Sequence, residues 1–260
     1  MRLPREFSAR QTETIPASES VQGGTPPAIR SVRKRTDDYF FCCMALLILA
    51  IVFIGFAQSY YLAGMLRAHL PTVLIHVHGA LMTCWILLFV AQVVLVSAKR
   101  IDWHMRLGVA GMVLAGVLVP VALATLIQSV RRRVVIAFGV DALFAGDVLQ
   151  LVSFSALIIW GFCVRRDGAA HKRLMLLAMV PLLGPAVARW PFAFANSVLG
   201  IFLLCDAVPV LLIFFDLWSF RKVRLVTACG VLLILATQVS SLPLAHTAFW
   251  HHVTVWVQSV

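Results

Sequence analysis

Long apolar runs alternate along the chain with short polar segments that hold most of its charged residues. A bilayer core about 30 Å thick is crossed by about 20 helical residues, and the apolar runs have about this length or more. The pattern therefore predicts an all-α, polytopic transmembrane helical bundle of about seven helices. The predicted helices lie within residues 39–66, 70–98, 107–130, 134–164, 171–189, 196–220 and 225–242.

Polar segments flank the predicted bundle on both sides. Residues 1–36 are basic and rich in Ser, Thr, Pro and Gly. They bury too little apolar surface to offset their chain entropy, so we expect a disordered cytoplasmic tail. Residues 37–243 would form the seven-helix membrane domain, with residues 70–190 as its core helices. Residues 244–260 carry several His and Trp side chains, as a periplasmic or interfacial tail would.

The composition indicates which solvent surrounds the chain. Hydrophobic residues make up 61% of it and charged residues 13%, whereas soluble domains are about 45–50% apolar and about 25% charged. Lipid is therefore the expected solvent. The net charge of +11 does not indicate a nucleic-acid partner, because the basic residues lie between the apolar runs, where they determine topology. The six cysteines lack CxxC spacing, so no metal site or disulfide framework is expected.

Lys and Arg residues are distributed unequally between the two sides of the predicted bundle. The side that holds the N-terminus collects 17 of the 22. Loops rich in Lys and Arg stay in the cytoplasm, so we expect the N-terminus inside and the C-terminus outside. The three consecutive arginines at 131–133 are an exception on the outer side, where lipid headgroups could bind them.

Few ionisable side chains interrupt the predicted helices. Each costs roughly 2.5–3.5 kcal/mol at a helix centre on insertion scales, so it requires a partner or a function. Asp141 and Asp216 lie near helix ends, where they are expected to reach water. The other candidates form one group at the inner end of the bundle and one at the outer end.

Two histidines open predicted helices at the inner, cytoplasmic end. His104 begins the third helix and His171 begins the fifth. Gly108 and Gly111 continue the face of His104 as a smooth stripe, which lets another helix approach closely or lets a flat macrocycle lie against the backbone. Two histidines from facing helices at one depth could hold a b-type haem axially. Alternatively, both are interfacial residues within basic collars.

The outer group could line a polar cavity that opens to the periplasm. It consists of His76, His78, Asp147, Arg189 and Asp206. Such a cavity suits a proton relay or a small-molecule site. His76 and His78 point about 200° apart on a regular helix, so they cannot ligate one metal together. Alternatively, each histidine hydrogen-bonds to a neighbouring helix and an Asp–Arg pair only joins helices.

Part of the chain resembles a known family. The likeness rests on His78-Gly79-Ala80-Leu81-Met82, Trp85, Arg100, Trp103, His104, Gly108 and Gly111. These residues resemble the second and third helices of the ascorbate-dependent transmembrane cytochromes b. The resemblance implies a four-helix core that carries b-type haem through histidines on alternate helices. That family pairs its second-helix histidine with one on the fourth helix, where this chain has none, so only His104 with His171 keeps the pattern.

The chain as a whole is also similar to uncharacterised multi-pass bacterial inner-membrane proteins. The shared pattern is H-G…H-x-R-L-G…H-K-R-L-M. This likeness implies a location in a bacterial inner (plasma) membrane, and it supplies no activity.

Three functional hypotheses follow. The first is a membrane haem-b protein that passes electrons to a redox partner, with His104 and His171 as axial ligands and His78 as a second haem site. The second is a non-redox small-molecule or proton carrier, or an assembly factor, that uses the outer group. The third is a structural membrane subunit without a site of its own. No motif assigns an enzymatic reaction.

Overall fold

The computed structural model describes residues 27–62, 72–132, 139–192 and 197–259, with side chains from residue 36 onward. Every regular element in these ranges is a helix, which confirms the predicted all-α class. Six helical stretches among them are long and apolar enough to cross a membrane. The chain is therefore a multi-pass membrane protein whose surroundings are a lipid bilayer.

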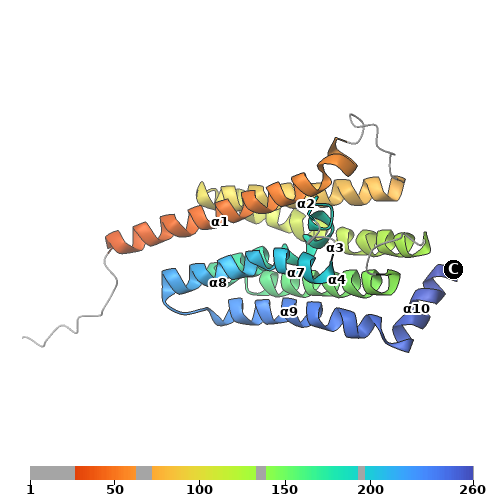
Figure 1. Cartoon of the computed structure of the whole chain (residues 1–260). Coiled ribbons are helices and arrows are strands. Elements are labelled where there is room, and N and C mark those ends of the chain that lie inside the picture. The colour runs from red at the N-terminus through yellow and green to blue at the C-terminus, as the bar shows by residue number, and fades with distance from the viewer. Residues whose placement is uncertain (1–26, 63–71, 133–138, 193–196, 260) are drawn as a thin grey trace, which may run out of the picture.

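The spanning stretches lie side by side with their axes close to one direction (Figure 1). We call the end of the bundle that holds His104 the inner end and the end that holds Arg131 the outer end, following the predicted orientation. The stretches are α1 with η1 (Pro27–Phe56 and Ala57–Tyr61), α2 (Val73–Ser97), α3 (Ile101–Arg131), α4 (Val140–Cys163), α7 with α8 (Val198–Cys205 and Ala207–Phe220) and α9 (Leu225–Ala245).

The fifth predicted helix, over 171–189, is not one continuous helix. It is divided into α5 (Gly168–Leu177), η2 (Val180–Leu182) and α6 (Gly184–Val187). Pro181 and Pro185 explain the break, because proline has no N–H to donate and its ring clashes with the preceding turn. The segment still runs through the bundle, since His171 lies beside His104 at the inner end and Arg189 lies over Phe56, near the outer end of α1.

Both predicted tails contain helix. α1 begins at Pro27, within the segment expected to be disordered, and residues 1–26 lie outside the described part. Residues 248–259 of the outer tail form α10 (Ala248–Ser259), which lies at the outer end (Figure 1). Trp250 Nε1 donates to the Asp141 carbonyl at 3.2 Å, and Arg131 Nε donates to the Val257 carbonyl at 3.3 Å. α10 is thus attached to the outer ends of α3 and α4.

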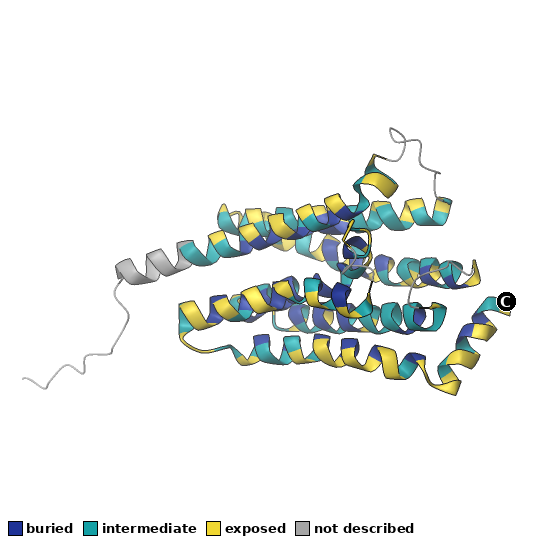
Figure 2. Ribbon diagram, viewed as in Figure 1, coloured by how far each residue is buried: buried dark blue, intermediate teal, exposed yellow. Residues whose placement is uncertain are grey.

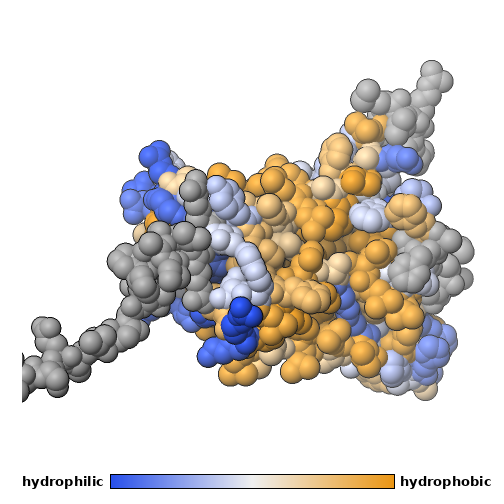
Figure 3. All heavy atoms as spheres, turned by 60° about the vertical axis from the view of Figure 1, so that its left-hand side comes forward, coloured by the Kyte–Doolittle hydropathy of each residue, from blue (hydrophilic) through white to orange (hydrophobic). Residues whose placement is uncertain are grey.

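The outside of the bundle differs from that of a soluble protein, whereas the core does not. The broken segment forms much of an apolar core, where Leu174, Leu177 and Met179 are 0% exposed. Large apolar residues also cover the outside, and Val73 and Leu225 are each 79% exposed. Exposed positions follow the outward faces of the helices (Figure 2), and the space-filling view shows an apolar belt between more polar ends (Figure 3). Such a belt matches lipid rather than water.

One glycine allows the broken segment to enter the core. A Cβ on Gly55 of α1 would lie 2.3 Å from the Ala186 carbonyl oxygen of α6. Backbone atoms cannot move aside as a flexible side chain can, so only glycine fits at this crossing. The close approach buries α6 against α1, and this packing stabilises the segment that the two prolines interrupt.

Candidate functional site

The inner end holds the two histidines predicted as haem ligands. His104 lies in the first turn of α3, and His171 lies in α5. Their ring centres are 6.2 Å apart and the ring planes are nearly perpendicular, at 81°. The fold therefore brings together two side chains that are separated by more than sixty residues of sequence.

A backbone carbonyl orients the His171 ring. Its Nδ1 lies 2.9 Å from the Gly161 carbonyl oxygen at the inner end of α4. Because a carbonyl only accepts, Nδ1 carries the proton and donates, which leaves the Nε2 lone pair free. This is the arrangement that fixes the tautomer and orientation of metal-bound histidines in proteins.

Two local features of the sequence position α5 for this contact. Asp167 caps the helix, since its Oδ1 accepts from the N–H groups of Ala169 at 2.9 Å and Ala170 at 3.2 Å. Gly161 allows α5 to approach α4, because a Cβ there would lie 2.3 Å from Met175 Cε. The cap is readable in the sequence, whereas the role of Gly161 depends on which helix crosses it.

His104 is contacted differently from His171. Its Nδ1 is buried and has no hydrogen-bond partner among the described residues, while its ring interacts with the backbone of Gln92 on α2. The stripe that follows it is used by α2, because a Cβ on Gly111 would lie 3.0 Å from Leu88 Cδ2 and a Cβ on Gly108 would lie 3.6 Å from Gln92 Nε2. The sequence left open whether this stripe admits another helix or a flat macrocycle. In the structure, the helix that lies against it is α2.

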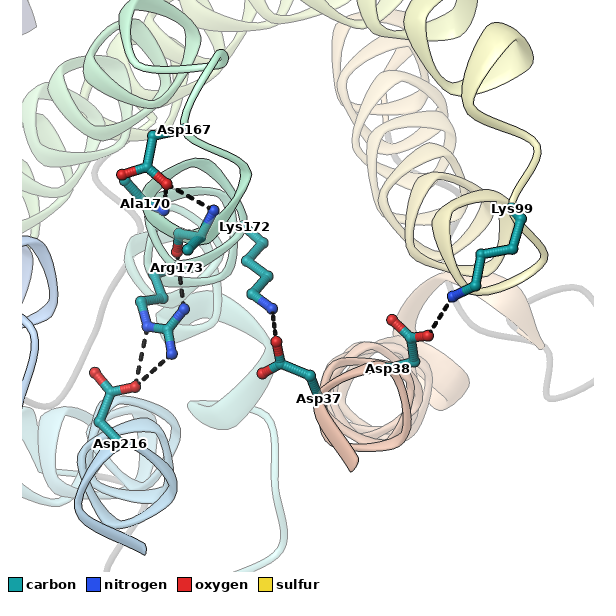
Figure 4. A network of polar contacts seen from close by, with 9 residues as sticks. Asp37, Asp38, Lys99, Asp167, Ala170, Lys172, Arg173 and Asp216 are labelled. Carbon is teal, nitrogen blue, oxygen red and sulfur yellow. Dashed lines mark hydrogen bonds and ion pairs between the residues drawn. The ribbon is translucent and has the colours of Figure 1, made fainter. Parts of the chain in front are cut away.

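The two residues after His171 anchor α5 in other directions (Figure 4). Lys172 pairs with Asp37 of α1. Arg173 donates to Asp216 Oδ1 of α8 through Nε at 3.0 Å and Nη2 at 2.6 Å, and both side chains of this pair are 0% exposed. The other Asp216 oxygen accepts from the Thr227 hydroxyl at 2.7 Å.

The burial of Asp216 corrects a prediction. We expected this carboxylate to reach water because it lies near a helix end, but it is fully buried and paired with Arg173. A buried carboxylate requires such a partner, since desolvation of an unpaired charge is very costly. Consecutive side chains of α5 thus contact α3, α1 and α8, which fixes the helix that carries His171.

Further basic side chains lie at the inner end without an acidic partner among the described residues. They are exposed and come from the turns next to both histidines: Arg100, Arg106, Arg165 and Arg166. Arg106 lies over the Trp103 ring at 5.7 Å, and Arg165 lies over the Phe162 ring at 4.2 Å. Their guanidinium groups are available to a carboxylate or a phosphate.

The outer group is only partly brought together. Arg189, beyond the last turn of α6, interacts electrostatically with Asp147, and no ion pair within 4.0 Å joins them among the described side chains. Desolvation lowers the pKa of Arg189, and the Asp147 carboxylate opposes this shift. His78 on α2 lies at the same depth as Asp147 on α4. The ring centres of Trp85 on α2 and Phe154 on α4 are 5.5 Å apart. The two helices run parallel, and His78 and Asp147 each lie seven residues before these aromatic residues.

The other two members of the outer group lie elsewhere. His76 is exposed, and its carbonyl accepts from the Tyr60 hydroxyl at 3.2 Å. Asp206 accepts from Gln238 Nε2 of α9 at 3.0 Å. The His78 Nδ1 atom is buried and has no partner in the described chain. These contacts therefore do not indicate a single cavity lined by all five residues.

No cluster of three or more His, Cys, Asp or Glu side chains suited to a metal ion occurs within the described ranges. A metal at His104 and His171 would need most of its ligands from a cofactor. No family model, curated protein or solved structure matches this chain. The fold defines the class, a multi-pass helical membrane protein, and the activity has to be argued from the side chains.

Proposed function

We propose that this chain is a membrane haem-b protein that passes electrons, with His104 and His171 as the axial ligands. The observation that carries the proposal is the 6.2 Å distance between the two ring centres. The chain was also expected from its sequence to lie in a bacterial inner (plasma) membrane with this end in the cytoplasm. The redox partner would then meet the protein at its cytoplasmic face.

The distance between the ring centres supports the proposal because it excludes a direct hydrogen bond between the two rings. Imidazole nitrogens bind metals at about 2.0–2.1 Å, so two opposed nitrogens lie about 4 Å apart and their ring centres about 6 Å apart. A hydrogen bond between the rings would bring the nitrogens to about 2.9 Å and the centres to about 5 Å. The observed 6.2 Å is too long for the direct hydrogen bond and is compatible with shared ligation, and it is also the spacing of an ordinary edge-to-face ring contact.

The chain's own groups supply orientation and charge. The Gly161 carbonyl holds His171 through Nδ1 and presents Nε2 to a ligand position. A b-type haem would add its iron as a one-electron carrier, tuned by these axial ligands. The haem propionates need cationic partners, and Arg100 and Arg165 are exposed at the same end.

A visible spectrum tests the proposal. The full-length protein, expressed with haem supplied and purified in detergent, should show a Soret band and one haem per chain. His104→Ala and His171→Ala should each abolish the low-spin spectrum, whereas His76→Ala, which alters an exposed histidine, should leave it unchanged. An absent Soret band in folded wild-type protein would sink the proposal.

The status of His78 is decided by the same measurement. His78 has no histidine partner in the pattern of the resembled family, and its Nδ1 is unpaired. One haem per chain that survives His78→Ala would exclude a second haem at this residue. Two haems per chain in the wild type, one of which is lost in His78→Ala, would assign His78 as a ligand of the second haem.

A second candidate function is a non-redox proton or small-molecule carrier in the outer half. The observation that favours it is the electrostatic interaction of Asp147 on α4 with Arg189 in the outer half of the bundle. Asp147→Asn should then abolish transport in reconstituted vesicles. Asp206→Asn is the matched control, because its carboxylate is already bonded to Gln238. Equal transport by wild type and Asp147→Asn would exclude this candidate.

A further inference from the structure

The turn between α8 and α9 gathers positive charge at the inner end of the bundle (Figure 1). It lies between Phe220 and Leu225 and contains Arg221, Lys222 and Arg224, which we call the basic turn. Arg221 and Lys222 are exposed and Arg224 is half-buried. No ion pair joins any of the three to a carboxylate among the described side chains. The basic turn therefore presents cations that the described part of the chain does not neutralise.

The backbone of Arg221 adds a second observation. In the described ranges, two residues other than glycine have a left-handed backbone, and both are basic residues of inner turns: Lys99 with a φ of 61° and Arg221 with a φ of 58°. Glycine is favoured after a helix in this conformation, because a Cβ makes it costly. Lys99 pairs with Asp38 at 2.5 Å. Arg221 has no acidic partner in the described chain, so its charge is available to an anion from outside.

A buried network fixes the basic turn from below. The Arg224 N–H donates to Asp216 Oδ2 at 3.3 Å, and the Thr227 hydroxyl donates to the same oxygen at 2.7 Å. Asp216 is itself paired with Arg173 of α5. The Arg224 guanidinium lies over the Phe220 ring at 4.8 Å. A guanidinium that stacks on a ring still presents the N–H groups at its edge to an acceptor.

An exposed apolar stripe begins directly beside the basic turn. Leu225, Leu232 and Val239 follow one another at intervals of seven residues, so they lie on one face of α9. They are 79%, 63% and 73% exposed. The stripe extends about 21 Å along α9, which is longer than the roughly 15 Å depth of the acyl chains in one leaflet. Trp218, in the last turn of α8, is 71% exposed, as tryptophan often is at a membrane interface.

The order of these features matches the parts of a phospholipid. The cations lie at the end of the bundle, where headgroups lie, and the apolar stripe continues from them into the apolar belt (Figure 3). Lipid chains cover such a stripe in any bilayer, so a neighbouring phospholipid only has to place its phosphate against the basic turn. An acidic protein or a free phosphate would use the cations and leave the stripe unused.

We propose that the basic turn and the apolar stripe together bind an anionic phospholipid of the leaflet at the inner end. Arg221 and Arg224 hold its phosphate, and one acyl chain lies along α9. The headgroup is anionic rather than zwitterionic, because uncompensated cations repel the positive end of a zwitterionic headgroup. The site is independent of the haem proposal, since it uses neither histidine and none of the arginines that face the propionates there.

Lipid binding measured by native mass spectrometry tests the site. The full-length protein in detergent is titrated with phosphatidylglycerol, which is anionic, or with phosphatidylcholine, which carries a phosphate but no net charge. The test variant is Arg221→Gln/Arg224→Gln. The matched control is Arg106→Gln/Arg166→Gln, which removes two exposed arginines from other parts of the same end. Circular dichroism confirms that both variants remain helical.

Wild-type protein should bind its first phosphatidylglycerol at least about tenfold more tightly than phosphatidylcholine, since each basic residue near a charged headgroup contributes about 1 kcal/mol. The test variant should lose this preference, and the control should keep it. Phosphatidylglycerol with a photoreactive group on one acyl chain should crosslink to α9 between Leu225 and Val239.

Three outcomes overturn the site. The first is equal affinity of the wild-type protein for the two lipids; polyglutamate binding that disappears in the test variant would then assign the basic turn to an acidic protein. The second is the same loss of preference in both double variants, which would mean that the charge of the whole inner end acts without a local site. The third is displacement of the lipid by inorganic phosphate, which would show that the apolar stripe contributes nothing.

Discussion

The carboxylates at the inner end of this bundle and the polar side chains in the outer half of α4 differ in how they are paired. At the inner end, Asp37 and Asp216 each pair with a basic residue of α5, and Asp38 pairs with Lys99 in the turn between α2 and α3. At the outer end, the Gln150 amide and the Ser153 hydroxyl have no partner in the described chain. Fully paired groups hold helices in one arrangement, whereas unpaired groups leave capacity for solvent or a ligand. The three ion pairs therefore lock α1, α5 and α8 and the turn before α3 together at the inner end.

The largest effect is expected from breaking the buried ion pair of the inner end. Arg173→Met leaves the Asp216 charge buried without its partner, which should lower the free energy of unfolding by about 3–5 kcal/mol. Denaturation in mixed detergent micelles measures this change. The double variant Arg173→Met/Asp216→Leu should recover most of the loss, because it removes both charges. A single variant as stable as wild type would contradict the assigned rigidity.

The next effect concerns the crossing of α4 and α5. Gly161→Ala places a methyl group 2.3 Å from Met175 Cε and 3.3 Å from Leu174 Cβ, which should cost about 1–3 kcal/mol and displace His171. Haem content, read from the Soret band, should fall with stability. Since the clashing atom is the end of a flexible side chain, Gly161→Ala/Met175→Ala should restore both readouts. If the double variant regained stability but not haem, the packing of α4 against α5 would not be what positions His171 as a ligand.

A smaller effect is expected at the outer end. Gln238→Leu removes the donor that Asp206 Oδ1 uses at 3.0 Å and should cost about 1–2 kcal/mol. The cost is below that of Arg173→Met because one hydrogen bond is lost rather than the partner of a fully buried charge. The comparison is made in the same denaturation assay. A loss as large as that of Arg173→Met would show that the outer end is as rigid as the inner end.

The smallest effect is expected where α10 meets α4. His251 Nδ1 lies 3.0 Å from Asp141 Oδ2, and the two side chains are 62% and 33% exposed. Exposed pairs contribute less than about 1 kcal/mol, so His251→Ala should barely change the midpoint of denaturation. A large loss would mean that α10 is part of the stable core rather than an attached interfacial helix.

Several elements could be predicted from the sequence because their signals are local. The apolar lengths predicted the spanning helices, and Asp167 before Gly168-Ala169-Ala170 has the character of a helix cap. The break of the fifth helix was missed, although Pro181 lies within the segment, because prolines also occur inside continuous helices here, as Pro120 does in α3. Whether a proline breaks a helix depends on the neighbours that can satisfy the freed carbonyls.

The partners of ionisable residues were harder to predict. Asp216 lies near a helix end, but Arg173 from α5 buries it completely. The five residues of the outer group were placed together only because they lie at a similar depth in the membrane. Depth does not determine toward which neighbour a side chain points around its helix. His76 therefore faces outward, and Asp206 turns to α9.

The sequence by itself determined that hydrocarbon surrounds this chain, how many residues cross it, and that His104 and His171 begin their helices at one depth. These properties follow from hydrophobicity and the rise of a helix, which need no knowledge of neighbours. Only the tertiary structure decided that the two ring centres lie 6.2 Å apart, that the Gly161 carbonyl orients one of the rings, and that Gln150 has no partner among the described residues. Those depend on helix rotation and crossing, which are set by packing between segments distant in the sequence.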